Sequence, residues 1–203
     1  MKKEFIIFDT EFTTWEGCIV HGWNDWKKRE VVQISALKVD AETLEVIEEF
    51  NAYVKPQINP ILSDYFVELT GLTNELIQEQ GIPFEQMYWQ FRTFVGDSIC
   101  YSHAWGSNDM SDIADGSVMR ENLCLFGLKD ENEPKYANIV PWFKKMYFEN
   151  KIEIKTQNSG AIAKLLGIEN ELKSLNLDEH NAIYDCYSIL LGIKFFKAKD
   201  LKK

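Results

Sequence analysis

The apolar positions of this chain alternate between short continuous runs and helical spacings. The run Phe5-Ile6-Ile7-Phe8 is typical of a central β-strand that is buried on both faces. Residues 31–39 and 46–54 read as two further strands, and the short turn-like segment between them predicts an antiparallel hairpin. A glycine-led turn at 96–97 opens a fourth strand over 98–104.

Helical patterns lie between and after these strands. The expected helices begin at capping residues or carry apolar residues three and four apart, and they lie at 73–78, 85–95, 109–125, 159–166 and 181–197. Gly116 is a weak point in the third of them, and the polar, turn-rich residues 127–138 are expected to form a loop. Strands first, then mixed strands and helices, predict an α/β or α+β domain around a mixed sheet.

Composition favours one domain. The chain has 203 residues, of which 45% are hydrophobic, and it shows no repeat and no break in composition. This suits a single domain over 1–203 with a full-sized core, and a loop rich in aromatic and basic residues, 13–30, inserted after the first strand. No apolar stretch approaches the ~20 residues that span a bilayer. The N-terminal apolar run is too short for a signal peptide, so a cytoplasmic location and no membrane partner are expected.

The formal net charge of −10 bears on the partners. Proteins that grip long nucleic acids usually have a basic footprint, and this total argues against tight, nonspecific binding along a duplex. It is compatible with a short or single-stranded nucleic acid that is held mainly at one end. No protein partner is indicated.

Two acids end the first strand. Asp9 and Glu11 are two residues apart on a strand, so both side chains emerge on the same face. They stand at its carboxyl end, where open α/β sheets place their sites, and two carboxylates this close repel each other unless a cation compensates them. The alternative is a solvated strand end, because the pattern Asp-x-Glu is common.

A second pair, His180 and Asp185, lies at the start of the last predicted helix. The first turns of this helix can direct Asp185 at the sheet, while the preceding loop lets His180 reach the same pocket. The alternative is a histidine that caps the helix or lies on the surface. Asp109 follows the fourth strand and could complete the set, as could Asp112 or Asp115 nearby. Asp109 could equally be an ordinary helix cap.

Collected into one pocket, these residues have a definite chemistry. Carboxylate oxygens are the ligands that Mg²⁺ prefers, and two such ions can clamp a scissile phosphate. A histidine beside them can take the proton from an attacking water. The combination indicates metal-dependent hydrolysis of a phosphodiester.

The ordered set Asp9-x-Glu11, Asp109 and His180-x(4)-Asp185 resembles the DEDD superfamily of 3′–5′ exonucleases, in particular its DEDDh branch. The stretch 53–73 and the Trp105-Gly106 pair before Asp109 resemble the Eri-type exoribonucleases, and the likeness runs from about Phe5 to Leu190. Asn108 departs from this pattern, since related enzymes usually have a bulky apolar or aromatic residue there.

The resemblance implies a ribonuclease H-like fold, an α/β mixed five-stranded sheet flanked by helices. It also implies that four acids bind two Mg²⁺ or Mn²⁺ ions and that His180 acts as general base. Those acids are Asp9, Glu11, Asp109 and Asp185. The 3′-terminal nucleotide would contact the backbone near Phe12 and Thr13, the wedge-like Leu72 and Trp105.

The segment 15–29 combines aromatic and basic residues. It contains Trp15, Trp23 and Trp26, followed by Lys27-Lys28-Arg29. Aromatic faces that stack bases and cations that meet phosphates are the features of single-strand binding proteins. The alternative is a loop whose tryptophans cover the core.

The leading hypothesis is a two-metal 3′–5′ exonuclease. It would act on the 3′ end of single-stranded nucleic acid, RNA preferred over DNA, and release nucleoside 5′-monophosphates. The alternatives are a DNA-directed proofreading or trimming nuclease of the same fold, or a regulatory binding protein with a nuclease fold and no turnover.

Overall fold

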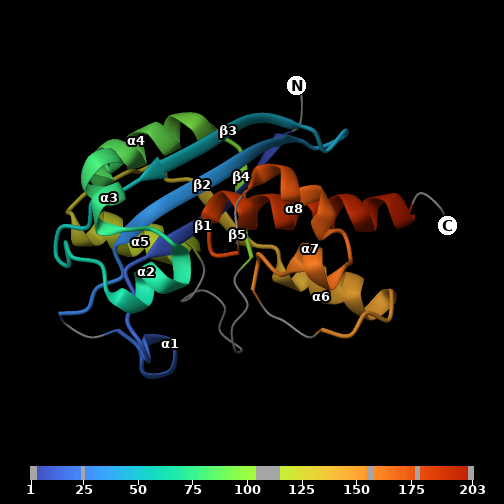
Figure 1. The fold of residues 1–203 in the computed structure, drawn as a ribbon. Helices are drawn as coiled ribbons and strands as arrows, with labels where there is room; N and C mark the ends of the chain where they lie inside the picture. Colours follow the sequence, from blue (N-terminus) through green and yellow to red (C-terminus); the bar gives the residue numbers. More distant parts are fainter. Residues whose placement is uncertain (1–3, 24–25, 104–114, 155–157, 177–178, 201–203) are drawn as a thin grey trace.

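A five-stranded mixed sheet forms the centre of the molecule (Figure 1). The computed structural model describes residues 4–23, 26–103, 115–154, 158–176 and 179–200. The strands, in the spatial order β3-β2-β1-β4-β5, are β1 (Glu4–Phe12), β2 (Val31–Asp40), β3 (Val46–Tyr53), β4 (Ile99–Ser102) and β5 (Lys135–Asn138). β1, β2 and β3 pair antiparallel, whereas β4 pairs parallel with both β1 and β5. The predicted mixed sheet is confirmed.

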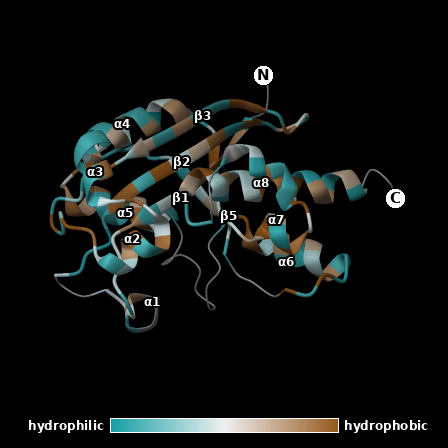
Figure 2. Cartoon of the chain, in the orientation of Figure 1, coloured by the Kyte–Doolittle hydropathy of each residue, from teal (hydrophilic) through white to brown (hydrophobic). Residues whose placement is uncertain are grey.

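Helices cover both faces of this sheet. One face packs against α4 (Phe84–Val95) and α5 (Asp115–Leu125). The other packs against α6 (Val140–Glu149), α7 (Ile162–Leu165) and α8 (Ala182–Asp200). The remaining helical segments are α1 (Cys18–His21), α2 (Asp64–Thr70), α3 (Asn74–Gln80) and the 3₁₀ turn Glu169–Leu175. Figure 2 shows apolar residues concentrated in the sheet and polar residues on the outer sides of α3 and α4.

The alternation along β1 decides where its acids face. Ile6 and Phe8 are fully buried in the core formed with α4 and α5, and Ile7 is fully buried in the core formed with α8. Because successive side chains of a strand point to opposite faces, Asp9 and Glu11 lie on the same side as Ile7, toward α8. The central strand therefore carries its two acids toward the start of the last helix.

Two predictions from the pattern need correction. The segment 127–138 is not a loop throughout, because residues 135–138 form the edge strand β5. Four residues with one partly buried ring carry too little periodicity to predict a strand. The strand depends on tertiary contacts, such as Tyr136 packing against Phe8 at 5.4 Å between ring centroids. Helices α2 and α6 were not anticipated. Of the helix predicted at 109–125, the described part begins at Asp115.

The loop after β1 is closed at its base by backbone and side-chain bonds. The Thr13 amide donates to the Glu30 carbonyl at 2.9 Å, and the Glu30 amide donates to the Thr13 hydroxyl at 2.9 Å. Among the described residues, no helix is both long and apolar enough to cross a membrane.

Candidate active site and metal centre

The candidate site lies at the carboxyl ends of the parallel strands β1 and β4, the edge of an α/β sheet where sites are usually built. β1 supplies Asp9, which is buried, and Glu11, which is half-buried. Asp185 comes from the first turn of α8 and is only 3% exposed. The sheet and the helix thus bring together acids that are more than 170 residues apart in sequence.

Glu11, His180 and Asp185 form one cluster. Each offers a ligand atom, and these three atoms lie within 4.8 Å of one another. His180 precedes α8 and has a left-handed backbone with φ 67°, a conformation that is uncommon outside glycine. This turn sets the imidazole at the mouth of the site, so the structure brings together three of the five predicted catalytic residues directly.

Asp115 is the acid that joins them from α5. Its buried carboxylate Oδ1 accepts hydrogen bonds from the Thr10 amide at 3.0 Å and the Thr10 hydroxyl at 2.6 Å. The neighbouring Gly116 allows this approach, since a Cβ there would lie 2.6 Å from the Tyr136 Cβ. Asp109 and Asp112 lie outside the described residues, so their assignment stays a prediction.

The four described acids disturb one another's ionisation. Burial raises the pKa of Asp9 well above its ordinary value, and the charges of Asp115, Asp185 and Glu11 raise it further. Burial, then Asp185 and Asp115, raise the pKa of Glu11 in the same way. Burial also raises the pKa of Asp185, to about 7. A divalent cation bound among these carboxylates would offset their mutual repulsion and favour their ionised forms.

Ser159, which the sequence interpretation missed, connects two of these acids. Its hydroxyl donates to Asp185 Oδ2 at 2.8 Å and lies 3.3 Å from Asp9 Oδ1. A Cβ on Gly160 would lie 2.4 Å from Asp185 Oδ1, so glycine leaves room for that oxygen. Ser-Gly before a short helix is ordinary capping chemistry, and nothing in the sequence points to an acid 26 residues away.

The donor set fits a hard divalent cation. Asp185 Oδ1 is buried and has no hydrogen-bond partner, which is costly for a carboxylate oxygen unless a cation binds it. All the converging acid ligands are carboxylate oxygens, the type that Mg²⁺ and Mn²⁺ prefer. Asp9, Glu11, Asp115 and Asp185 are the residues that could hold such ions.

Metal-free protein is expected to lose stability as the pH rises. The Asp185 pKa of about 7 exceeds the unfolded value of about 3.9, so the folded state binds more protons between these values. The free energy of unfolding therefore falls from about pH 4 to about pH 7. Mn²⁺ or Mg²⁺ should raise the melting temperature by about 5–10 °C at about 100 times its dissociation constant.

Thermal melts at about pH 5 and about pH 8, one series in EDTA and one in Mn²⁺ without chelator, measure both effects on either side of the Asp185 pKa of about 7. Asp185→Asn is the control, since it removes the buried charge and should flatten both responses. Equal melting temperatures with and without the ion at the higher pH would contradict a metal centre here.

The residues predicted to contact the 3′-terminal nucleotide have contacts within the chain or lie outside the described residues. Leu72 is 2% exposed and packs in a core cluster with Val32 and Phe66, so the structure shows it in a packing role. The Thr13 amide and carbonyl are engaged by Glu30 and Trp23. Phe12 is half-buried, and its ring centroid lies 5.7 Å from that of Trp23. Trp105 lies outside the described residues. Nucleotide contacts at these residues stay predictions.

The tryptophans of the loop after β1 divide into two groups. Trp23 Nε1 donates to the Thr13 carbonyl at 3.0 Å, and the Arg29 guanidinium lies 5.4 Å from its ring centroid. Trp23 thus supports the loop. Trp26 is 63% exposed, so it does not cover the core. Binding of single strands by this segment stays a prediction.

The sequence of this chain is similar to those of known exonucleases. The sequence profile of the RNase T exonuclease family matches residues 6–191. Human ERI1 exoribonuclease 2 is 38% identical over 76 residues, 36% of this chain and 11% of that protein. The 3′-5′ exonuclease eri1 of Schizosaccharomyces pombe is 39% identical over 70 residues, 34% of this chain and 22% of that protein. The matched segments are thus a small part of each relative's length.

A solved structure shares the fold over nearly the whole chain. The nuclease domain of 3'hExo, a DEDDh family member bound to rAMP, superposes with a TM-score of 0.64 at 22% identity. The match covers 99% of this chain and 92% of that domain. The expected ribonuclease H-like exonuclease fold is thereby confirmed.

Proposed function

Because the chain belongs to the RNase T family of exonucleases, we propose that it is a metal-dependent 3′–5′ exonuclease acting on single-stranded nucleic acid, RNA in preference to DNA. The observation that carries the proposal is the convergence of Glu11, His180 and Asp185 within 4.8 Å beside two further buried acids. A fold used only for binding has no need to bury mutually repelling carboxylates around a histidine.

We assign two divalent ions to four acids of the described structure: Asp9, Glu11, Asp115 and Asp185. When bound, Mg²⁺ or Mn²⁺ supplies positive charge that neutralises the carboxylates and polarises the scissile phosphate. Asp115 takes the place of the third acid because it is buried, held by Thr10, and raises the pKa of Asp9. Ser159 keeps Asp9 and Asp185 in one orientation.

His180 carries the proton transfer. A water oxygen forms a bond to the phosphorus, and its proton passes to a nitrogen of the His180 imidazole. The bond from phosphorus to the 3′ oxygen of the preceding nucleotide breaks, and that oxygen takes up a proton from solvent water. The products are a nucleoside 5′-monophosphate and a strand shortened by one residue with a 3′ hydroxyl. The nuclease domain of 3'hExo, which shares the fold, is bound to rAMP, which is a nucleoside monophosphate as well.

The preference for RNA rests on relatives that are named exoribonucleases, and the expectation of an end-bound strand rests on the acidic total charge. A net charge of −10 disfavours binding along a long duplex and favours a strand engaged at its end. RNA and DNA differ at the 2′-hydroxyl, so the preference is directly measurable.

Purified protein should shorten a 5′-labelled single-stranded RNA one nucleotide at a time in Mg²⁺ or Mn²⁺ and leave it intact in EDTA. The matched DNA strand and the two duplexes test the substrate class, and Asp185→Asn is the inactive control. Faster cleavage of DNA would favour the trimming nuclease. Binding with no cleavage in either ion would favour the regulatory alternative and contradict the proposal.

A further inference from the structure

Trp15, Trp26 and Lys27 form a group, here called the aromatic platform, in the loop after β1; Trp26 is exposed, and Trp15 and Lys27 are half-buried. The two indole centroids lie 6.3 Å apart with the ring planes at 62°. The Lys27 ammonium lies 5.3 Å from the Trp15 centroid and 4.9 Å from that of Trp26. Trp26 is 63% exposed, so one of the largest apolar side chains is presented to solvent beside a cation.

The platform is held in place by the neighbouring loop. Asn59 Nδ2 donates to the Trp26 carbonyl at 2.8 Å, and Asn59 Oδ1 accepts from the Lys28 amide at 3.1 Å. The buried Glu30 carboxylate accepts three amides of residues 57–59, at 2.6, 2.9 and 2.7 Å. Trp26 is thus exposed on a preorganised backbone, which lowers the entropic cost of binding a ligand.

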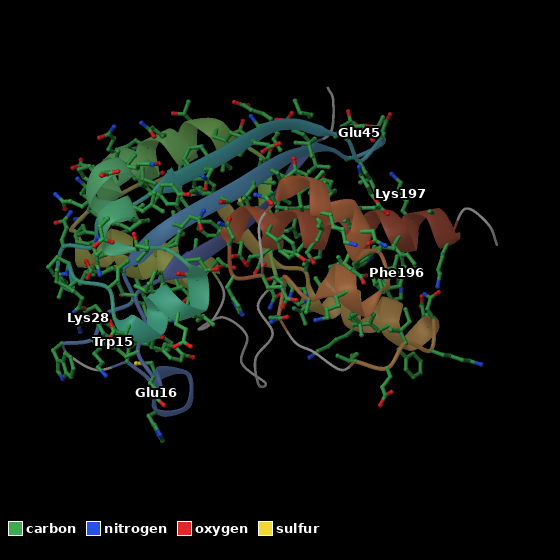
Figure 3. The ribbon with its side chains drawn as sticks, in the orientation of Figure 1. Trp15, Glu16, Lys28, Glu45, Phe196 and Lys197 are labelled. Carbon is green, nitrogen blue, oxygen red and sulfur yellow. The ribbon has the colours of Figure 1, made fainter. Side chains whose placement is uncertain are left out.

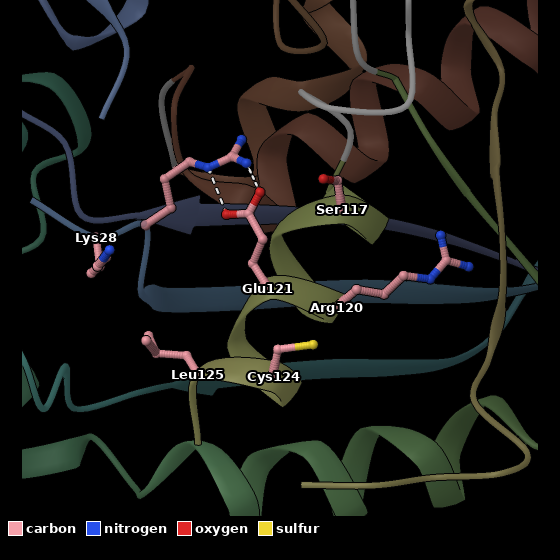
Figure 4. A pocket seen from close by; sticks show the side chains of 7 residues that line it. Lys28, Ser117, Arg120, Glu121, Cys124 and Leu125 are labelled. Carbon is pink, nitrogen blue, oxygen red and sulfur yellow. Dashed lines mark hydrogen bonds and ion pairs between the residues drawn. The ribbon is translucent and has the colours of Figure 1, made fainter. Parts of the chain in front are cut away.

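A cationic pocket adjoins the platform along the chain. Its volume is about 690 Å³, and three cations and one acid line it: Lys28, Arg29, Arg120 and Glu121. Figure 4 shows Glu121 of α5 with Lys28 on one side and Arg120 on the other. The Arg29 Nε donates to the Glu121 carboxylate at 2.9 Å. Arg120 is held by Glu133 at 2.8 Å. In a chain of net charge −10, this local excess of cations is a distinct feature.

Both features lie close to the candidate active site. Trp15 is four residues beyond Glu11, so their Cα atoms are at most about 14 Å apart. The pocket runs along α5, whose first residue is Asp115. Figure 3 shows Trp15 and Lys28 on the same side of the molecule, below α2. A strand whose 3′ end is in the site would have its upstream nucleotides within reach of this surface.

We propose that the aromatic platform and the cationic pocket form a subsite for the upstream nucleotides of a single-stranded nucleic acid. A base stacks on Trp26, and the phosphates next to it meet Lys27 and the pocket cations. Stacking needs an unpaired base, so the subsite selects single strands without reading sequence. The inference deepens the proposed function and rests on it, since it places the 3′ end at the acids.

The test is the affinity for a fluorescein-labelled oligo(U) of about 12 nucleotides, measured by anisotropy in EDTA so that no cleavage is needed. Trp26→Ala should weaken binding about tenfold, the effect of losing one stacked base. Phe148→Ala is the matched control, because Phe148 is 85% exposed on α6, away from the platform, and its removal should leave the affinity unchanged.

Salt dependence provides a second measurement. Lys27→Gln should lower the slope of log affinity against log salt by about 0.7, the value for one phosphate contact with a single strand. Unchanged affinity in Trp26→Ala and an unchanged slope in Lys27→Gln would overturn the subsite and leave the platform to a protein partner. That result would not affect the exonuclease proposal, which loss of turnover in Asp185→Asn tests separately.

Discussion

Asp115→Asn is expected to lower the turnover number at least about 10²-fold, because it removes a ligand of an ion that would contribute several kcal/mol to stabilising the reacting phosphate. The fold should survive, since the amide oxygen of asparagine can still accept the hydrogen bonds from Thr10 at 3.0 and 2.6 Å. In metal-free protein the variant should be at least as stable as the wild type, because burial raises the pKa of Asp115 and its charge is unfavourable there.

Asp109→Asn and Asp112→Asn are the matched comparisons, since each makes the same chemical change within the same segment of chain. Single-turnover rates at saturating Mn²⁺ with labelled single-stranded RNA compare the three variants, and thermal melts report their folding. We expect the largest loss in Asp115→Asn. Full activity in Asp115→Asn together with an inactive Asp109→Asn would instead assign the third acid to Asp109, as the motif comparison predicts.

The parts of the fold that could be predicted depend on contacts within one element. The run Phe5-Ile6-Ile7-Phe8 is buried on both faces because β1 is central, and the helix predicted at 181–197 is α8, Ala182–Asp200. β5 could not be predicted in this way. Its four residues form a strand because β4 and the core accept them, and their own pattern is polar.

The residues of the candidate site likewise differ in whether a local pattern could predict them. Asp9, Glu11 and Asp185 could be predicted because each has a defined place on a strand or in the first turn of a helix. The third acid could not be fixed, because Asp109, Asp112 and Asp115 follow one another closely in the sequence and no local pattern distinguishes them. Ser159 meets Asp9 across 150 residues of chain, a contact that no local pattern encodes.

The charge of the chain has a similar explanation. A total of −10 includes the four acids of the described site, whereas the cations of the proposed subsite are Lys27, Lys28, Arg29 and Arg120. The net charge of the chain therefore includes two local regions whose charges have opposite signs. Two divalent ions at these four acids would cancel their charge and so remove the repulsion between the site and the phosphates of a 3′ end.

His180→Asn is expected to lower the turnover number by about 10²–10⁴-fold, the usual contribution of a general base. Asparagine is the informative substitution because the residue has φ 67°, which asparagine tolerates. Alanine would add about 1–2 kcal/mol of backbone strain and mix a folding defect with the loss of the imidazole. The asparagine variant should therefore melt close to the wild type.

The same variant separates two roles that the geometry allows for the imidazole. His180 lies within 4.8 Å of ligand atoms of Glu11 and Asp185, so it could hold a metal ion instead of a proton. If His180 is a metal ligand, its loss should raise the Mn²⁺ concentration for half-maximal activity, and excess Mn²⁺ should restore turnover. If His180 is instead the general base, the loss of turnover should persist at saturating Mn²⁺, and the Mn²⁺ concentration for half-maximal activity should be unchanged. We expect the second result, and restoration by excess Mn²⁺ would refute the role as base.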